Sequence, residues 1–312
     1  MKKLFLLLFP LFIQGQDVGI GNWKDYLSYN SASYIAEADN KIYCVTSGSL
    51  FYLDKNDNAI NRMSKVTGLS GVDVKQVAYS EALKITIITY KNCNIDLLKG
   101  NSIINISDIK RKEITGLKSI NNITVDGGVA YLSTTFGLVL VDLEKEEIKD
   151  TYGIGGQNDN LIINGCAFLG DSIIVATSDG LYFANIHAQV LSDFNNWGLW
   201  ENTYENYENI ISFDGSFYFD NDTNLISISY NNNTLIKTNF DRIDINEDDG
   251  TYRELTHLKF ENIQYAWIDN EAIIWVADSV NGLLKFVNYE YQETFIPEGP
   301  VRNDIYSLEF AE

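Results

Sequence analysis

The chain has 312 residues and a formal net charge of −20, and 45% of its residues are hydrophobic, including 19 tyrosines and 16 phenylalanines. This acidity argues against duplex DNA, RNA and anionic membrane surfaces as partners, because each of them requires cationic groups that replace counterions. The apolar and aromatic content is too high for a disordered chain, so we expect a globular protein.

The first residues have the form of a secretory signal. Met1, Lys2 and Lys3 precede the apolar stretch LFLLLFPLFI, which is about ten residues long and too short to span a bilayer. We therefore predict a signal peptide over residues 1–15 and a mature chain that begins near Gln16. The protein would then be exported, to the periplasm or to the cell surface.

A layout of a turn, an apolar strand, a second turn and another apolar strand recurs along the chain. It is clearest at residues 171–183 (DSIIVATSDGLYF) and returns at 40–52, 127–140 and 270–284, with weaker copies at 81–97 and 215–228. The turn before the second of these strands provides six markers about 44 residues apart, except for the last, which is about 14 residues late. They are Ser49, Asn94, Gly137, Gly180, Asn224 and Gly282.

A period of about 40 to 45 residues with about four short strands is typical of a β-propeller blade. We predict blades at about residues 32–66, 73–109, 119–152, 161–200, 208–240 and 255–296. The alternative is a set of unrelated hairpins in a β-sandwich, which would need no fixed period.

Three segments outside these blades need their own interpretation. Residues 23–27 (WKDYL) are expected to be the outer strand of the last blade, which would close the ring by pairing the two chain ends in one sheet. The late sixth marker is due to residues 241–253 (DRIDINEDDGTYR), which we interpret as an exposed loop or an extra hairpin because they contain no long apolar run. Residues 304–310 (DIYSLEF) have the pattern of the inner strand of a seventh unit.

The predicted fold is therefore an all-β propeller of about seven four-stranded blades, six of them complete and the last one partial. The propeller would cover residues 16–296. Residues 297–312 would begin a further blade or a second propeller in a chain that is truncated.

The sequence offers little material for catalysis or metal binding. The two histidines, His187 and His257, are interpreted as structural or solvated. The three cysteines, Cys44, Cys93 and Cys166, are too few for a disulfide framework and are expected to be buried, although one pairing stays open. We expect no catalytic residue, no metal and no cofactor.

Aromatic residues gather between the fourth and fifth predicted blades, where they could contact a sugar or a peptide. Packing between blades is the alternative explanation for the same residues. The candidates for a binding site are Trp197, Trp200, Tyr204 and Tyr207.

Four stretches give the chain a resemblance to a known family: residues 21–46 (GNWKDYLSYNSASYIAEADNKIYCVT), 105–123 (NISDIKRKEITGLKSINNI), 147–156 (EIKDTYGIGG) and 296–310 (IPEGPVRNDIYSLEF). The chain resembles the N-terminal propeller of PorZ-like proteins of the type IX secretion system of Bacteroidota. At the level of the repeats it also resembles the periplasmic sensor propellers of hybrid two-component regulators.

The resemblance implies an exported, non-catalytic protein-binding scaffold at the cell surface. Its partners would be secretion-system proteins at the outer membrane, including a sortase-like peptidase complex, with no nucleic acid and no membrane insertion. In that family a second propeller and a C-terminal sorting domain follow the first propeller. A glycan-sensing periplasmic propeller is the alternative function.

Overall fold

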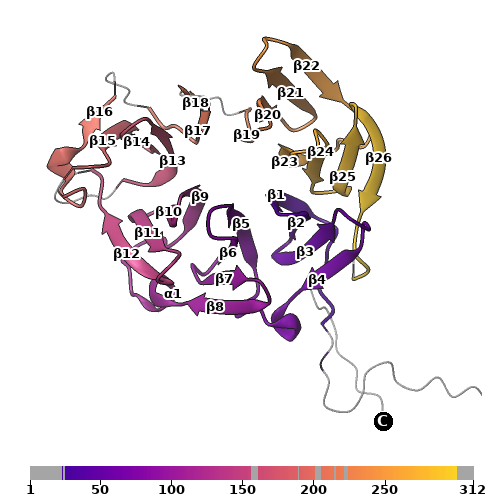
Figure 1. The fold of residues 1–312 in the computed structure, drawn as a ribbon, viewed down its shortest axis with the longest axis horizontal. Coiled ribbons are helices and arrows are strands. Elements are labelled where there is room, and N and C mark those ends of the chain that lie inside the picture. Colours follow the sequence, from indigo (N-terminus) through magenta and orange to yellow (C-terminus); the bar gives the residue numbers. More distant parts are fainter. Residues whose placement is uncertain are drawn as a thin grey trace, which may run out of the picture.

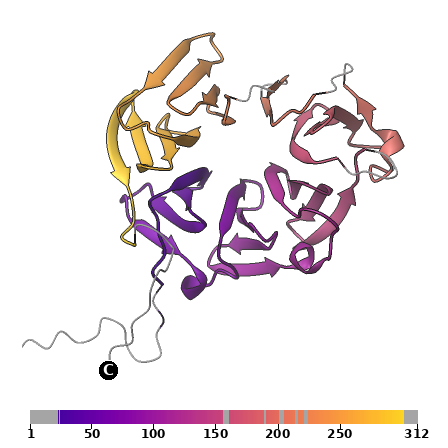
Figure 2. The ribbon, with the colours of Figure 1, turned by 180° about the vertical axis from the view of Figure 1, so that it is seen from behind.

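The computed structural model describes residues 23, 25–155, 161–188, 190–200, 205–213, 216–220 and 224–300. The strands form seven antiparallel sheets that surround a common centre, as the two opposite views in Figures 1 and 2 show. Six sheets have four strands and one has two. The predicted all-β propeller with six complete blades is thus confirmed. Within the described residues, helix is confined to α1 (Asp108–Arg111) and two single 3-10 turns, η1 (Lys65–Thr67) and η2 (Phe194–Asn196).

The strands of each blade are consecutive in the chain and pair in that order. Blade 1 contains β1 (Ala32–Ala38), β2 (Lys41–Thr46), β3 (Ser49–Asp54) and β4 (Ile60–Met63). Blade 2 contains β5 (Val74–Ser80), β6 (Ile85–Tyr90), β7 (Ile95–Lys99) and β8 (Ser102–Ile106). Blade 3 contains β9 (Ile120–Asp126), β10 (Val129–Thr134), β11 (Gly137–Asp142) and β12 (Glu147–Tyr152).

The second half of the ring contains the incomplete sheet. Blade 4 consists of β13 (Ile163–Leu169), β14 (Ser172–Thr177), β15 (Gly180–Asn185) and β16 (Gly198–Leu199), and the described strands of blade 5 are β17 (Asn209–Phe213) and β18 (Ser216–Asp220). Blade 6 contains β19 (Ser227–Asn231), β20 (Thr234–Thr238), β21 (Arg242–Glu247) and β22 (Tyr252–Thr256). Blade 7 contains β23 (Ile263–Ile268), β24 (Ile274–Asp278), β25 (Gly282–Val287) and β26 (Glu290–Phe295).

The position of a strand within its blade decides its sequence pattern. The second strands are covered by neighbouring blades on both sides, so all six residues of β6 are buried. The outer strands lie at the rim, and β12 (EIKDTY) has only its last residue buried. Separate apolar clusters lie at the junctions of blades 1 and 2, 2 and 3, 3 and 4, 4 and 5, 6 and 7, and 7 and 1. Each blade therefore depends on its neighbours for its core.

Three of the six marker positions are glycines that begin a third strand, and the geometry explains the residue type. Gly137 has a φ of +127° and Gly180 a φ of +136°, which L-residues with a side chain rarely adopt. A Cβ atom on Gly137 would also lie 2.5 Å from the carbonyl oxygen of Tyr152. The markers at the start of β11, β15 and β25 thus indicate a tight turn that brings the third strand against the outer strand.

The prediction for the acidic stretch at 241–253 was wrong in its placement. The stretch forms β21 and the start of β22, which are the outer half of blade 6 and not an addition to it. Ile243 and Ile245 are fully buried, and they alternate with Arg242, Asp244 and Asn246. A strand with one covered face needs only alternate apolar residues. The lack of a long apolar run in this stretch was therefore no evidence against a strand.

The predicted blade at 208–240 combined parts of two sheets. Residues 209–220 form the two-stranded blade 5, whereas 227–238 are the first half of blade 6. Asn224 lies in the connection between them and does not precede a third strand. The incomplete blade is therefore the fifth in the ring. The strand expected at 304–310 lies outside the described residues, as does the predicted signal peptide.

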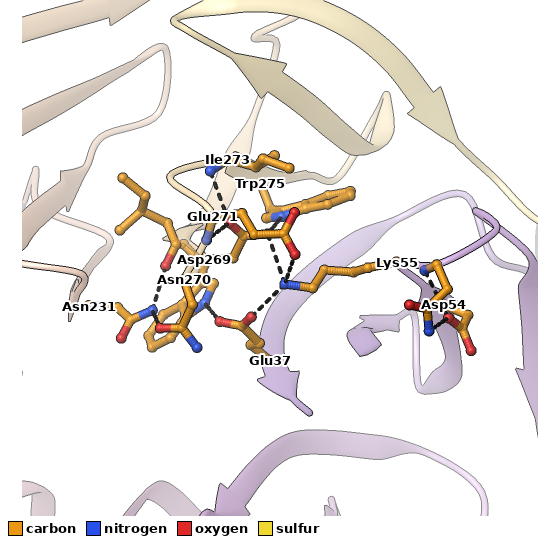
Figure 3. Close-up of polar contacts among 12 residues, drawn as sticks. Glu37, Asp54, Lys55, Asn231, Asp269, Asn270, Glu271, Ile273 and Trp275 are labelled. Atoms are coloured by element: carbon orange, nitrogen blue, oxygen red, sulfur yellow. Dashed lines mark hydrogen bonds and ion pairs between the residues drawn. The ribbon is translucent and has the colours of Figure 1, made fainter. Parts of the chain in front are cut away.

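The ring closes through side chains at the junction of blades 7 and 1, which Figure 3 shows. Lys55 lies between three carboxylates: its Nζ is 2.9 Å from Glu37 Oε1, 3.5 Å from Asp269 Oδ2 and 3.3 Å from Glu271 Oε1. Trp275 Nε1 donates to Asp269 Oδ2 at 3.0 Å. Burial alone would lower the pKa of Lys55, but Glu37 and Asp269 outweigh it and raise that pKa, so the amine stays charged.

The prediction that residues 23–27 pair with the last blade was also wrong. Trp23 and residues 25–31 form no strand, because β26 already supplies the outer strand of blade 7. The segments before β1 and after β26 still run side by side: a Cβ atom on Gly299 would lie 2.3 Å from the carbonyl oxygen of Leu27. Tyr29 is buried in the same junction, with its ring 6.2 Å from that of Phe51.

Candidate functional site

The predicted aromatic residues lie on two different faces of blade 4. Trp197 is buried at the junction with blade 3, where its Nε1 donates to the carbonyl oxygen of Leu191 at 2.8 Å. Tyr207 is buried at the junction with blade 5, and its ring is 5.3 Å from that of Phe219. The structure therefore separates Trp197 from the other candidates.

Trp200 is the one of the three described candidates that is only half-buried. Its ring stands edge-on to Phe183 at 5.5 Å and to Phe217 at 5.3 Å, so it links blade 4 to blade 5. Tyr204 lies outside the described residues. Packing accounts for the buried pair, and a binding role for these four residues stays a prediction.

A set of polar residues that the sequence analysis missed lies at one end of the central axis. Five inner strands carry a β-bulge at their second residue, where the register with the second strand shifts. A bulge changes the direction in which a side chain projects and is a designed feature of a sheet. All five bulged residues are polar: Ser33, Lys75, Asn121, Asn164 and Gln264.

Three of these side chains bond to the next blade where its inner strand begins. Lys75 Nζ donates to Ser119 Oγ at 2.7 Å, just before β9. Asn121 Nδ2 donates to the carbonyl oxygen of Ile163 at 2.9 Å. Asn164 Nδ2 donates to the carbonyl oxygen of Tyr207 at 2.8 Å. The bulges thus hold neighbouring blades in register, and their only sequence signal is a polar residue directly after the first apolar residue of the strand.

A cavity of about 300 Å³ opens beside these bulges, lined by Asn121, Ile162, Asn164, Ser178, Asn206 and Glu208. Within it, Asn164 Nδ2 also donates to Asn206 Oδ1 at 3.1 Å, and Asn206 Nδ2 donates to Glu208 Oε1 at 3.2 Å. Amide and carboxylate groups of this kind can hydrogen-bond the main chain of a peptide or another neutral polar ligand.

The described residues contain no group of three or more His, Cys, Asp or Glu side chains that is placed so that it could hold a metal ion. Cys44, Cys93 and Cys166 are buried and unpaired, and burial raises the pKa of the Cys166 thiol to about 11. His257 stacks on Tyr291 at 5.1 Å, and His187 is exposed beside Asp171. Nor does the described part of the chain contain a helix with the length and hydrophobicity of a membrane span.

Solved structures establish the relationship of the fold. PorZ, described as an essential bacterial surface component of the type IX secretion system of Porphyromonas gingivalis, matches with a TM-score of 0.79 at 20% identity. The match covers 93% of this chain and 42% of that chain, so this chain spans less than half the length of the solved PorZ chain.

Two further structures are more distant. A chain of the mitotic checkpoint complex matches with a TM-score of 0.57 at 11% identity, covering 94% of this chain and 100% of that one. The extracellular domain of a one-component system from B. thetaiotaomicron matches with a TM-score of 0.47 at 11% identity, covering 84% and 41%. At 11% identity the match to the chain of the mitotic checkpoint complex concerns the fold alone.

The sequence itself shows the family. No curated protein matches the chain. The family described as "TSS9, PorZ, N-terminal beta-propeller domain" matches residues 42–198, which is about half of the chain and extends from β2 to the first residue of β16. The chain therefore belongs to the family of PorZ N-terminal β-propeller domains of the type IX secretion system.

Proposed function

We propose that this propeller is an exported, non-catalytic scaffold that binds protein partners of the type IX secretion and attachment machinery. The observation that carries the proposal is the family match over blades 1 to 4. Its partners are secretion-system proteins at the outer membrane, including a sortase-like peptidase complex. A propeller suits this role because its sheets hold many loops rigidly at both ends of one axis.

One face of the ring has the surface chemistry that such a role needs. Two kinds of connection lie together on this side, here called the entry face: those that lead into the inner strands and those between second and third strands. For example, Ile263 N at the start of β23 donates to the carbonyl oxygen of Phe240, between β20 and β21, at 3.0 Å. Most exposed large apolar residues lie on it, and they include Leu117, Ile162, Phe240, Leu258 and Val280. Exposed apolar side chains that gather on one side of a molecule favour contact with a protein surface.

Cross-linking in the native host tests the proposal. The tagged full chain should be cross-linked at the cell envelope and its partners identified by mass spectrometry, with type IX attachment proteins as the expected result. Leu117→Asp and Leu258→Asp place charges at residues that are 74% and 97% exposed on the entry face, and each should reduce the recovery of those proteins.

Val190→Asp is the matched control, because Val190 is 50% exposed in the connection between β15 and β16, on the opposite face. It should leave the recovery unchanged. Recovery of oligosaccharide without any secretion protein would contradict the scaffold role and favour a sensor propeller.

A further inference from the structure

Blade 5 has fewer described strands than the other blades. Each of the other six sheets has four strands, whereas β17 and β18 form a sheet of two, and no described strand pairs with β18 on the side away from β17. An unpaired strand edge presents main-chain N–H and C=O groups and is a ready template for another strand. Blade 5 is the one place in the described ring where a sheet has this reduced width.

The junctions between complete blades show what would flank a third strand in blade 5. Third strands of neighbouring blades share apolar clusters: Ile243 and Ile245 of β21 lie with Leu284 and Phe286 of β25. Leu97 of β7 likewise lies with residues of β11. A third strand in blade 5 would accordingly lie between β15 of blade 4 and β21 of blade 6.

The blade 4 side of this position is aromatic. Leu181 is buried there, and the half-buried rings of Phe183 and Trp200 stand edge-on to each other at 5.5 Å. Trp200 also contacts Phe217 of β18, so an aromatic surface extends from the third strand of blade 4 to the edge of blade 5.

The side of blade 6 that faces this position carries charged residues. Ile243 and Ile245 point toward blade 7, so the alternating Arg242 and Asp244 point toward blade 5. Lys237, which pairs with Asp244 across the strands, has its Nζ 4.1 Å from the ring of Tyr218 in β18 and confirms this direction. Arg242 Nε is 3.5 Å from Asp244 Oδ1 and 3.8 Å from Glu254 Oε2, and Arg242 is 44% exposed in its side chain.

We propose that the outer edge of β18 binds an extended segment of a partner protein as the third strand of blade 5. Alternate side chains of a strand point to opposite faces, so apolar or aromatic residues of this segment would contact Phe183 and Trp200, and charged residues would contact Arg242 and Glu254. Cationic residues suit the second face where they lie beside Glu254, whose side chain is 52% exposed.

The connection that follows β18 does not supply this strand. The connection from Asp220 to Ser227 is too short to contribute two strands of about five residues and return to β19. The proposal concerns the chemistry of the bound segment, and it holds or fails independently of the identity of the secretion partners.

The probe is a synthetic peptide of about ten residues in which valine or tyrosine alternates with lysine. A peptide of the same composition with its apolar and lysine residues in separate blocks is the control. The alternating peptide should bind saturably to the full chain and slow hydrogen exchange in residues 216–220, whereas the block peptide should not.

Two variants locate the site. Ser216→Lys places a lysine at the exposed start of β18, where it should weaken binding at least about tenfold by charge repulsion and by blocking strand addition. Ser172→Lys is the matched control, because Ser172 begins β14, whose two edges are already paired with β13 and β15, and it should leave binding unchanged.

Each variant should first be shown to keep the circular dichroism spectrum and melting temperature of the parent chain. The proposal is overturned if the alternating peptide does not bind at concentrations up to about 1 mM. It is equally overturned if Ser216→Lys binds the peptide as well as the parent does, or if the protected amides lie outside blade 5.

Discussion

At the junction of blades 7 and 1, the amine of Lys55 pairs with the carboxylates of Glu37, Asp269 and Glu271. Its side chain is 9% exposed, and those of Glu37 and Asp269 are 6% and 0% exposed. Removing one partner of a buried ion pair leaves the other charges without compensation. Lys55→Met should therefore lower the free energy of unfolding by about 3 to 5 kcal/mol, measured by urea denaturation.

Lys84 provides the control for Lys55. It forms an ion pair with Asp39 at 3.3 Å, but its side chain is 56% exposed, and exposed pairs contribute about 0 to 1 kcal/mol. Lys84→Met should be nearly neutral. Equal losses for the two variants would show that the buried cluster does not stabilise the ring closure.

Buried phenols make the stability of the chain sensitive to alkaline pH. Burial raises the pKa of Tyr29, Tyr43 and Tyr131 to about 12. A phenol with a higher pKa in the folded chain contributes stability that is complete below the unfolded pKa of about 10 and is lost as pH rises toward about 12. The urea midpoint should fall over this range, and Tyr43→Phe should make the fall less steep. An unchanged midpoint up to about pH 11.5 would contradict this expectation.

At the scale of one element, the turn before β11 determines whether blade 3 can form. Gly137→Ala places a Cβ atom 2.5 Å from the carbonyl oxygen of Tyr152 at a φ of +127°, so it should cost about 3 kcal/mol or more in unfolding free energy. Gly127→Ala is the matched variant, because Gly127 has a φ of +54° with no atom within 4 Å of the added Cβ, and should cost about 1 to 2 kcal/mol. Similar costs for both would show that the contact with Tyr152 has no effect.

The elements that the sequence predicted well are those with strong local signals. Second strands such as β14 are covered on both sides and contain an apolar run, residues 173–176 in β14, and Gly137, Gly180 and Gly282 mark the third strands. The strand β21 was missed because only one of its faces is covered, so its apolar residues are just Ile243 and Ile245. Its other face is charged, and no described third strand of blade 5 covers it. That missing neighbour cannot be inferred from residues 242–247 themselves.

The candidate site was predicted less well, for a similar reason. Trp197 and Trp200 are near neighbours in the sequence, yet they belong to the junctions of blade 4 with different blades. Composition alone could not show this separation. The bulged residues Asn121 and Asn164 could have been found from the repeat, since both stand second in an inner strand, but their bonds to the next blade depend on the assembled ring.

At the scale of the whole molecule, every blade is made from one continuous segment, and the two ends of the described part of the chain lie beside each other at Leu27 and Gly299. A circular permutant that joins these ends and opens the chain at Leu258, which is 97% exposed between blades 6 and 7, should therefore fold. Its circular dichroism spectrum should match that of the parent, with a melting temperature lower by a few degrees, about 4 °C. A permutant opened at Gly48, between β2 and β3, should fold less well because that cut divides a hairpin.

The absence of a shared closing strand also determines how the ring would respond to tension. A pull on residues 25 and 300 acts first on the contacts of Lys55, Trp275 and Tyr29, because no main-chain ladder in the described chain crosses from blade 7 to blade 1. Once that junction has separated, a terminal blade can unravel while its neighbours persist. Each blade of about 40 residues would then release on the order of 140 Å of chain. A propeller built in this way would lengthen in steps under load, because its blades would unfold one after another.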